Sequence, residues 1–356
     1  SLEGEEMGVN LPGFKKGDRT DIELPAVQRE LIDALYRAGK KIILVNCSGS
    51  PIGLEPETKK CEAILQAWYP GQQGGTAVAE VLFGDYNPGG RLPMTFPRHV
   101  GQLPLYYNFK TSGRRYEYVD MEYYPLYRFG FGLSYTSFEY SNLKIQEKPD
   151  GNITVQATVK NTGSRAGDEV AQLYVTDMYA SVKTRVMELK DFERVHLQPG
   201  ESKTVSFELT PYDISLLNDR MDRVVEKGEF KICVGGMSPD YKANNEIKHS
   251  VGFSDKKKGV SGMLDYTHEF GADFDLSISK VEENLTKNQK TVWVSVKNKG
   301  TLMDIGKVEM FVDGKKVGDA IHYELGAGEE KLIPFKLGKD NKQPVAFTTK
   351  YKMVAL

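Results

Sequence analysis

The sequence predicts an α/β segment followed by two β-sandwiches. Up to residue 133, helical periodicity alternates with short continuous apolar runs. From residue 134 onward, apolar and polar residues alternate with a period of two, which is typical of strands with one buried face. A pattern from this alternating region then recurs in the last part of the chain, which indicates a second sandwich.

A helix is expected to follow Pro25, which suits a first helical turn because its missing N–H would be unpaired there. Gly39 is placed to end this helix. Continuous apolar runs at 42–45 and 63–68 predict buried parallel strands, and another helix is expected from about Thr76 to Phe83. The segment predicts βαβ units but is shorter than a doubly wound domain. The first helix should bury one face, made of Val27, Leu31, Ala34, Leu35 and Ala38.

The first sandwich is expected over residues 134–255, with a turn at Asn161-Thr162-Gly163. The run from Val170 to Val175 is apolar in both alternations, so both of its faces should be partly buried. Other strands are indicated by one-sided alternation at Ile153, Val155, Ala157 and Val159, at Val205, Phe207 and Leu209, and at Phe230, Ile232 and Val234.

The second sandwich is expected over residues 256–356, behind a polar linker near 254–271. The evidence for it is an internal sequence repeat. The stretch from Val159 to Gly163 recurs at Val296 to Gly300, and Leu197 to Glu201 recurs loosely at Leu325 to Glu329. In each copy an alternating strand follows, although Pro334 interrupts the second one. Two sandwiches of related type explain the repeat better than chance.

Composition excludes several classes of function. The net charge of −2 and pI near 6.3 give no field that would attract nucleic acid or an anionic membrane. No apolar run approaches the roughly 18 residues that span a bilayer. The basic run Lys256 to Lys258 is interpreted as a solvated segment. The five histidines are scattered and no CxxC pair exists, so no metal or other cofactor is expected.

The three cysteines allow a Cys47–Cys61 disulfide, but free buried thiols are favoured. Cys47-Ser48-Gly49-Ser50 follows a predicted strand but lacks the G-x-S-x-G pattern of a serine hydrolase. Gly71 to Gly75 lacks the Lys-Ser/Thr of a phosphate loop. The sequence therefore offers neither nucleophilic serine chemistry nor nucleotide binding.

Three ordered stretches resemble glycoside hydrolase family 3. They are Gly17-Asp18-Arg19 with the following Leu24 to Gln28, the stretch from Trp68 to Pro97, and the stretch from Pro125 to Thr136. The resemblance covers roughly residues 1–250. It implies the later half of the family's α/β sandwich domain (residues 1–133) and then a fibronectin type III-like domain (residues 134–255). Residues 256–356 resemble a CARDB-type Ig-like module.

The resemblance implies a retaining, exo-acting β-glucosidase or β-xylosidase that removes terminal β-linked sugars from oligosaccharides. Such enzymes place two carboxyl groups about 5–5.5 Å apart. In the family, a (β/α)8 barrel supplies the Asp nucleophile and the α/β domain supplies the acid/base Glu. The barrel is not in this sequence, so the chain alone is expected to be inactive. A non-catalytic carbohydrate-binding or spacer module is the alternative. The family also implies a periplasmic or extracellular location.

The expected acid/base residue lies in the acidic stretch that begins the chain. Alignment on Gly4 places Glu5 at the family's catalytic position, with Glu3 and Glu6 as alternatives. A solvated acidic loop would explain the same residues. Asp18 and Arg19 would anchor this loop, or form a surface ion pair worth under about 1 kcal/mol.

Aromatic residues supply the other candidates for sugar contact. Trp68 and Tyr69 could stack on a sugar face, although a core Trp at the end of a strand is the commoner arrangement. A second group could line the sugar site or pack at a domain interface. It comprises Tyr116, Tyr118, Tyr123, Tyr124 and Tyr127.

Overall fold

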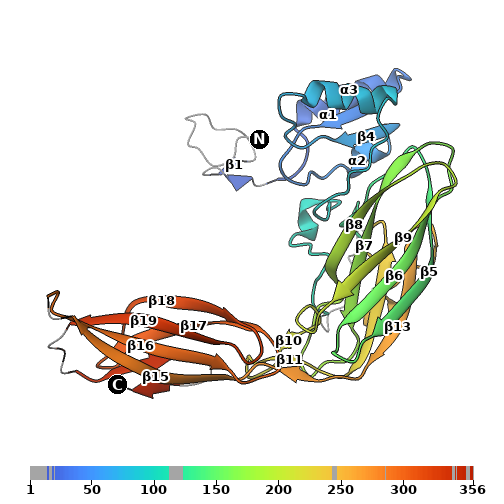
Figure 1. Ribbon diagram of the computed structural model, residues 1–356. Coiled ribbons are helices and arrows are strands. Elements are labelled where there is room, and N and C mark those ends of the chain that lie inside the picture. The colour runs from blue at the N-terminus through green and yellow to red at the C-terminus, as the bar shows by residue number, and fades with distance from the viewer. Residues whose placement is uncertain are drawn as a thin grey trace.

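The computed structural model describes three units in chain order: a small α/β unit and two β-sandwiches joined near their ends (Figure 1). The residues described are 21–111, 123–242, 247–284, 286–338, 341, 343–349 and 353–355. The backbone of two short paired strands, β1 (Phe14–Lys15) and β2 (Asp18–Arg19), is described as well.

The α/β unit is built around two parallel strands, β3 (Ile43–Asn46) and β4 (Ala63–Gln66), in register from Ile43↔Ala63 to Asn46↔Gln66. The expected parallel arrangement is therefore seen in part, as a two-stranded sheet. The unit has three helices: α1 (Ala26–Arg37), α2 (Glu55–Thr58) and α3 (Gly74–Phe83). Helix α1 begins directly after Pro25, as predicted, and Gly39 follows its end with φ of 68°. Helix α3 begins two residues before the expected Thr76 because Gly74 and Gly75 are already helical.

The predicted buried face of α1 is wrong. Val27 is 70% exposed and Leu31 is 61% exposed, whereas Ile32, from another face, is buried. Ile43 on β3 and Phe83 on α3 are also exposed. The α/β unit has a small core at Leu24, Ile32, Ile42, Ile52 and Leu54, and no element within the described ranges covers the outer apolar face of α1. The amphipathic pattern is present, but the described chain supplies no second layer against it.

The first sandwich packs a three-stranded sheet, in the order β5-β6-β9, on a four-stranded sheet, in the order β13-β12-β7-β8. The predicted one-sided alternations are confirmed, since the apolar positions of β6, β9 and β12 are all buried. Strand β7 is buried on both faces, as its pattern predicted. The strands are β5 (Phe138–Glu147), β6 (Ile153–Asn161), β7 (Gly167–Asp177), β8 (Glu188–Leu197), β9 (Ser202–Leu209), β12 (Gly228–Gly235) and β13 (Gly259–Tyr266).

The expected linker at 254–271 contains a strand instead. β13 pairs antiparallel with β12 along its whole length, from Gly228↔Tyr266 to Gly235↔Gly259. Polar residues such as Ser261 and Asp265 interrupt its apolar positions, which made this edge strand look like a solvated segment in the sequence. The first sandwich therefore continues to Tyr266.

Short elements close this part of the fold. A small sheet of β10 (Leu216–Leu217), β11 (Arg223–Val225) and β14 (Phe270–Gly271) lies where the two sandwiches meet (Figure 1). A 3-10 turn, η1 (Val100–Gln102), and a single helical turn, α4 (Ile247–Ser250), complete the elements before the second sandwich.

The second sandwich repeats the strand order of the first. Sheet β15-β16-β19 corresponds to β5-β6-β9, and sheet β21-β20-β17-β18 corresponds to β13-β12-β7-β8. Pro334 is accommodated because β19 is an edge strand of its described sheet. The CARDB-type assignment of this module stays a prediction. Its strands are β15 (Phe274–Asn284), β16 (Gln289–Asn298), β17 (Asp304–Val312), β18 (Lys315–Leu325), β19 (Glu330–Gly338), β20 (Val345–Thr348) and β21 (Met353–Ala355).

Candidate functional site

The carboxyl ends of β3 and β4 form the candidate site, because ligands of open α/β sheets bind at such edges. The buried Asn46 amide there donates to Gln66 Oε1 at 2.6 Å and to Ser48 Oγ at 3.0 Å. Ser48 Oγ in turn donates to Ser50 O at 2.9 Å. This network fixes the start of the two loops that leave the sheet, so their later residues emerge at defined positions.

Trp68 and Tyr69 begin the loop after β4 but point to different surroundings. Trp68 has φ of 55°, and its ring meets Phe96 edge-on at a centroid distance of 6.1 Å. Such a left-handed backbone is unusual for a bulky residue and costs about 1–3 kcal/mol. Tyr69 is 59% exposed, and its ring lies so close to Gly49 that a Cβ there would sit 2.5 Å from Tyr69 Cε2. Of the two, Tyr69 presents its ring to solvent, and Trp68 packs on a neighbouring ring.

Trp68 also lines a cavity of about 540 Å³ between β4, α3 and the segments around residues 88–96 and 127–135. The walls are mostly apolar and include Leu54, Phe96, Tyr127 and Phe131. Sugar sites need several convergent polar groups, and here charged groups are few, with Glu62 and Arg91 among the lining residues. The cavity therefore has the character of a packing surface.

The candidate acid/base residues Glu3, Glu5 and Glu6 lie outside the described residues. So do Tyr116, Tyr118 and the side chains of Asp18 and Arg19, whose expected ion pair stays a prediction. The backbone of Asp18 and Arg19 forms β2, paired with β1.

A partly buried ion network holds the segment that leads into α1. Arg29 Nε donates to Glu57 Oε1 at 2.9 Å, and Arg29 Nη2 donates to Gly53 O at 2.9 Å and also pairs with Glu23. Burial lowers the pKa of Arg29, but hydrogen bonds to both carboxylates outweigh it and leave that pKa raised. The backbones of Glu23 and Gly53 also form an isolated parallel β-bridge. The sequence reasoning missed this anchor, because its members are 28 residues apart.

The segment after α3 contacts the first sandwich. We call this contact the joint; it consists of Asn87 and Arg91 with their partners Ser134, Tyr135, Ala166 and Glu169. Asn87 Nδ2 donates to Ala166 O at 2.9 Å, while Asn87 Oδ1 accepts from Ser134 Oγ at 2.9 Å and from Tyr135 N at 2.8 Å. A Cβ on Gly167 would lie 2.5 Å from Asn87 Nδ2, so glycine is needed for the close approach. One asparagine thus joins three segments that are far apart in sequence.

A buried ion pair lies in the same joint. Arg91 Nη2 and Glu169 Oε2 are 2.9 Å apart, with side chains only 9% and 4% exposed. A Cβ on Gly132 would meet Gly90 O at 2.4 Å and Arg91 Nη1 at 2.9 Å, which explains the glycine at position 132. Sequence reasoning assigned no role to Arg91. The glycines packed around it were the available signal.

The described tyrosines of the aromatic stretch are packing residues. Tyr123 and Tyr124 lie 6.3 and 5.9 Å from the Tyr241 ring, and Tyr124 OH donates to Tyr241 O at 2.9 Å. Tyr127 stacks on Phe131 at 5.2 Å. The contacts of Tyr123 and Tyr124 with Tyr241 agree with packing at a domain interface, whereas Tyr127 packs within the α/β unit.

The cysteines and the possible metal ligands were the other candidates for chemistry. The three cysteines are free, and the expectation that they are buried holds for Cys233 but is wrong for the exposed Cys47. Among the described residues, no group of three or more His, Cys, Asp and Glu is placed to hold a metal ion. In the same part of the chain, no helix is long and apolar enough to cross a membrane.

Comparison with known sequences identifies the two domains that this joint connects. Residues 1–135 match the glycosyl hydrolase family 3 C-terminal domain, and residues 169–238 match the fibronectin type III-like domain. The chain is therefore similar, in this order, to a family 3 C-terminal domain and a fibronectin type III-like domain, as the three motifs suggested.

Particular relatives match about two thirds of this chain. A xylan 1,4-β-xylosidase of Xylanibacter ruminicola is 48% identical over 242 residues, which are 67% of this chain and 28% of the relative. A periplasmic β-glucosidase of Salmonella typhimurium is 42% identical over 245 residues, or 65% of this chain and 32% of the relative. A β-glucosidase of Listeria innocua, solved with glucose, superposes with a TM-score of 0.62 at 32% identity, covering 71% of this chain and 34% of that one. The chain thus spans about a third of the length of these relatives.

Proposed function

We propose that this chain is the C-terminal part of a retaining, exo-acting β-glycosidase that removes terminal β-linked glucose or xylose from oligosaccharides. The observation that carries the proposal is the 42–48% identity to a β-glucosidase and a β-xylosidase over about two thirds of this chain. In this proposal Glu5 is the general acid/base. The Asp nucleophile belongs to a barrel outside this chain, in the same gene or on a partner chain.

The uncovered face of the α/β unit supports a missing partner. Val27, Leu31 and Ile43 expose apolar side chains, and β3 pairs only with β4 among the described strands. Exposed apolar surface joined to an open strand edge is a surface that further chain would cover. We propose that upstream strands complete the sheet beside β3 and that the barrel lies beyond the carboxyl ends of β3 and β4.

The chemistry then divides between two carboxyl groups. The barrel Asp attacks the anomeric carbon while Glu5 protonates the leaving oxygen. Glu5 next takes a proton from water, which attacks the glycosyl-enzyme and releases the sugar with net retention. Tyr69, exposed at the same edge of the sheet, is the better placed aromatic for contact with sugar. Secretion to the periplasm or cell exterior is part of the proposal and is supported by the periplasmic relative.

The test uses a form of the protein that includes the upstream barrel. Glu5→Gln should lower kcat for an aryl β-glucoside or β-xyloside by about 10²–10⁴-fold. Azide should partly rescue Glu5→Ala, because it replaces water as a nucleophile that needs no base. Glu3→Gln is the matched control. If Glu3→Gln shows the loss and Glu5→Gln does not, the acid/base is Glu3. If Glu3, Glu5 and Glu6 can each be changed to Gln without a loss of kcat, the proposal fails.

A spacer or carbohydrate-binding module is the second candidate, favoured by the repeated sandwich architecture. It predicts sugar binding that persists unchanged in Glu5→Gln, without turnover in any form of the protein.

A further inference from the structure

The second sandwich carries a tryptophan on the outer face of its sheet β15-β16-β19 (Figure 1). Along β16, Val292, Val294 and Val296 are fully buried in the core. Trp293 alternates with them, so its side chain points to the opposite face of the sheet, where it is partly exposed. The core of the sandwich therefore does not account for this aromatic side chain.

Two apolar residues of β19 extend the surface around Trp293. Pro334 lies directly opposite Trp293, and Leu332 lies opposite Ser295, the next outward residue of β16. Pro334 is exposed and Leu332 is 44% exposed. Directly opposite and diagonal residues of antiparallel strands are close enough for such side chains to form one surface. We call Trp293, Leu332 and Pro334 the platform.

The first sandwich shows that the fold does not require the platform. In the equivalent sheet β5-β6-β9, Gln156 lies five residues before the end of β6, as Trp293 does in β16. The partner of Gln156 on β9 is Ser206, and the next outward position of β9 is Thr204. All three counterparts of the platform are polar, as expected for the solvated face of a sheet. The apolar residues of the second sandwich are thus available for a ligand.

Two charged neighbours on β15 position the indole ring. Trp293 Nε1 donates to Glu282 Oε2 at 2.9 Å, and Lys280 Nζ lies 5.1 Å from the centroid of the ring. The ring is therefore oriented before a ligand arrives. A ligand that stacks on the ring face beneath Lys280 displaces its ammonium group, but the Lys280 side chain is 50% exposed and such cation–π contacts are weak.

The charges on this outer face balance one another. Its strand positions carry three lysines and three carboxylates, which are Lys280, Lys297, Lys336, Asp275, Glu282 and Glu330. The face therefore has no net charge with which to attract an ionic ligand. The platform is also small, because a stable protein interface buries at least roughly 1,000 Å² and one tryptophan with two smaller apolar side chains supplies only part of that area. A small neutral ligand matches it better than a second protein.

A β-linked sugar chain has the properties that the platform selects. The hydroxyls of β-linked glucose and xylose are equatorial, so C–H groups cover both faces of each ring and suit an aromatic ring face. Hydroxyls at the ring edge need polar partners. The side chains of Ser277, Thr291 and Glu282 lie on the same face around the tryptophan and supply them.

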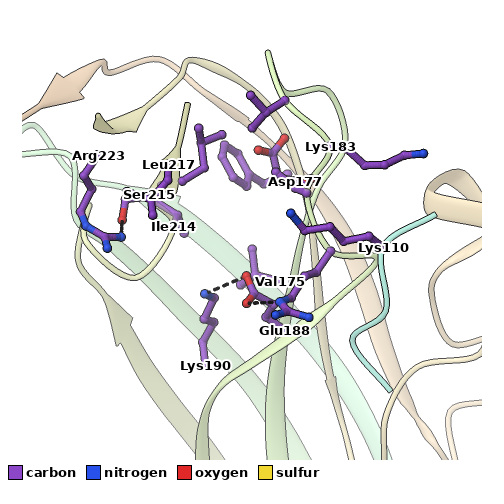
Figure 2. A pocket seen from close by; sticks show the side chains of 15 residues that line it. Lys110, Val175, Asp177, Lys183, Glu188, Lys190, Ile214, Ser215, Leu217 and Arg223 are labelled. Carbon is purple, nitrogen blue, oxygen red and sulfur yellow. Dashed lines mark hydrogen bonds and ion pairs between the residues drawn. The ribbon is translucent and has the colours of Figure 1, made fainter. Parts of the chain in front are cut away.

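The first sandwich holds a different kind of hollow, a cavity of about 310 Å³ (Figure 2). On its wall, Glu188 lies 3.3 Å from Lys190 Nζ and 3.7 Å from Arg185 Nε. Arg223 Nη1 donates to Ser215 Oγ at 3.0 Å. These charged side chains bind protein groups, and a neutral sugar has no charge with which to replace an ion pair. The platform is therefore the better match for an uncharged glycan.

We propose that the platform binds a neutral β-linked glycan chain, with one pyranose ring stacked on Trp293 and the adjoining sugar over Pro334 and Leu332. The choice of β-linked glucose or xylose rests on the proposed function. Binding itself needs neither Glu5 nor the barrel. Loss of the platform would leave hydrolysis by a barrel-containing form intact, and absence of hydrolysis would leave binding by the isolated chain measurable, so the two proposals can fail separately.

Titration calorimetry of the full 356-residue chain tests the proposal. The probes are xylohexaose, cellohexaose and the α-linked maltohexaose. At least one of the two β-linked probes should bind, with an affinity at least about tenfold higher than that for maltohexaose. This affinity should not change as salt is raised from about 0.05 to 0.5 M, because the ligand is neutral.

Three variants assign the binding to the platform. Trp293→Gln introduces the residue found at the equivalent position of the first sandwich and should lower the affinity at least about tenfold. Pro334→Ser with Leu332→Thr keeps the tryptophan and should cause a smaller loss. The matched control is Phe192→Gln, which removes a 62% exposed ring from the first sandwich and should leave the affinity unchanged. Urea unfolding shows whether each variant is folded, and the double variant tests the platform even where Trp293→Gln is not.

Four results would overturn the proposal: no binding of either β-linked probe, equally tight binding of maltohexaose, unchanged affinity in both folded platform variants, or an equal loss in Phe192→Gln. A fifth comes from analytical ultracentrifugation. A dimer of the native chain that is lost in Trp293→Gln would assign the platform to a second copy of this chain instead of a glycan.

Discussion

Asn161 and Asn298 occupy equivalent positions in the two sandwiches and make the same hydrogen bonds. Asn161 Nδ2 donates to Arg165 O at 2.7 Å and Leu197 O at 3.0 Å, and Asn298 Nδ2 donates to Leu302 O at 2.8 Å and Leu325 O at 3.2 Å. The amide N–H two residues on donates to each side-chain oxygen, at 3.0 Å from Gly163 and 2.9 Å from Gly300. The sequence repeat therefore corresponds to the same hydrogen-bonded structural motif in both sandwiches.

Replacing either asparagine should destabilise its own sandwich. Both side chains are fully buried, so Asn161→Ala or Asn298→Ala removes both carbonyl hydrogen bonds of the asparagine and should cost about 2–3 kcal/mol. Urea unfolding followed by circular dichroism measures the loss. Lys160→Ala and Lys297→Ala, at exposed neighbouring positions, are matched controls expected to stay within about 0.5 kcal/mol. Equal stability of asparagine and lysine variants would show that the motif is not stabilising.

The Arg91–Glu169 pair should be the strongest single tie between the α/β unit and the first sandwich. Arg91→Met leaves a buried carboxylate without its cation and should cost about 3–5 kcal/mol. Adding Glu169→Gln should recover part of this loss, because the buried charge is then gone. Lys203→Met, which breaks an exposed pair with Glu193, should cost under about 1 kcal/mol. A loss no larger in Arg91→Met than in Lys203→Met would contradict this role.

The contact between the two sandwiches should hold them at a fixed angle. Arg223 pairs with the buried Asp304 at 2.7 Å, and its guanidinium lies 4.7 Å from the Tyr212 ring centroid. Leu302 also enters the core of the first sandwich. Asp304→Asn keeps the size but removes the charge, so small-angle scattering should show a broader distribution of particle dimensions. An unchanged scattering profile would mean that packing alone sets the angle.

The His268–Glu147 pair predicts a pH-dependent contribution near the same contact. The hydrogen bond with Glu147 raises the pKa of His268 above 6.5, so its stabilisation is complete below pH 6.5 and is lost as pH rises through the raised value. Burial raises the pKa of Glu147, but hydrogen bonds from His268 and Thr267 outweigh it and bring it below 4.5. Its contribution is therefore present above pH 4.5 and is lost as pH falls through the lowered value.

Both groups are charged between pH 4.5 and 6.5. The difference in unfolding free energy between the native chain and His268→Gln should be largest in that window and smaller on either side. Denaturant titrations at pH 3, 5.5 and 9 measure it. A difference that does not vary with pH would mean that the pair carries no charge-dependent stability.

The sequence predicted the sandwiches well because strand alternation is a local signal. Val155, Val205 and Ile232 are buried as their periodicity required. It failed at α1, where Val27 and Leu31 form a proper amphipathic face that the described chain does not cover. Periodicity shows which face of a helix is apolar, but it does not show which other part of the protein covers that face.

The joint between the α/β unit and the first sandwich could not be predicted from the sequence, for a different reason. Asn87, Arg91 and Glu169 are polar residues whose partners lie 47–79 positions away, so no local pattern reveals them. The motifs that carried the family resemblance proved to include this joint. The acid/base loop was predicted from the family resemblance alone. The kinetic comparison of the Glu5 and Glu3 variants tests it.

Hydrolysis of an aryl β-glucoside and an aryl β-xyloside by the isolated 356-residue chain tests the central claim most directly. A chain that holds the acid/base without its nucleophile should show no turnover above the uncatalysed rate, and adding the upstream barrel should restore it. Robust turnover by the isolated chain, lost in Glu5→Gln, would contradict the claim that the nucleophile lies elsewhere.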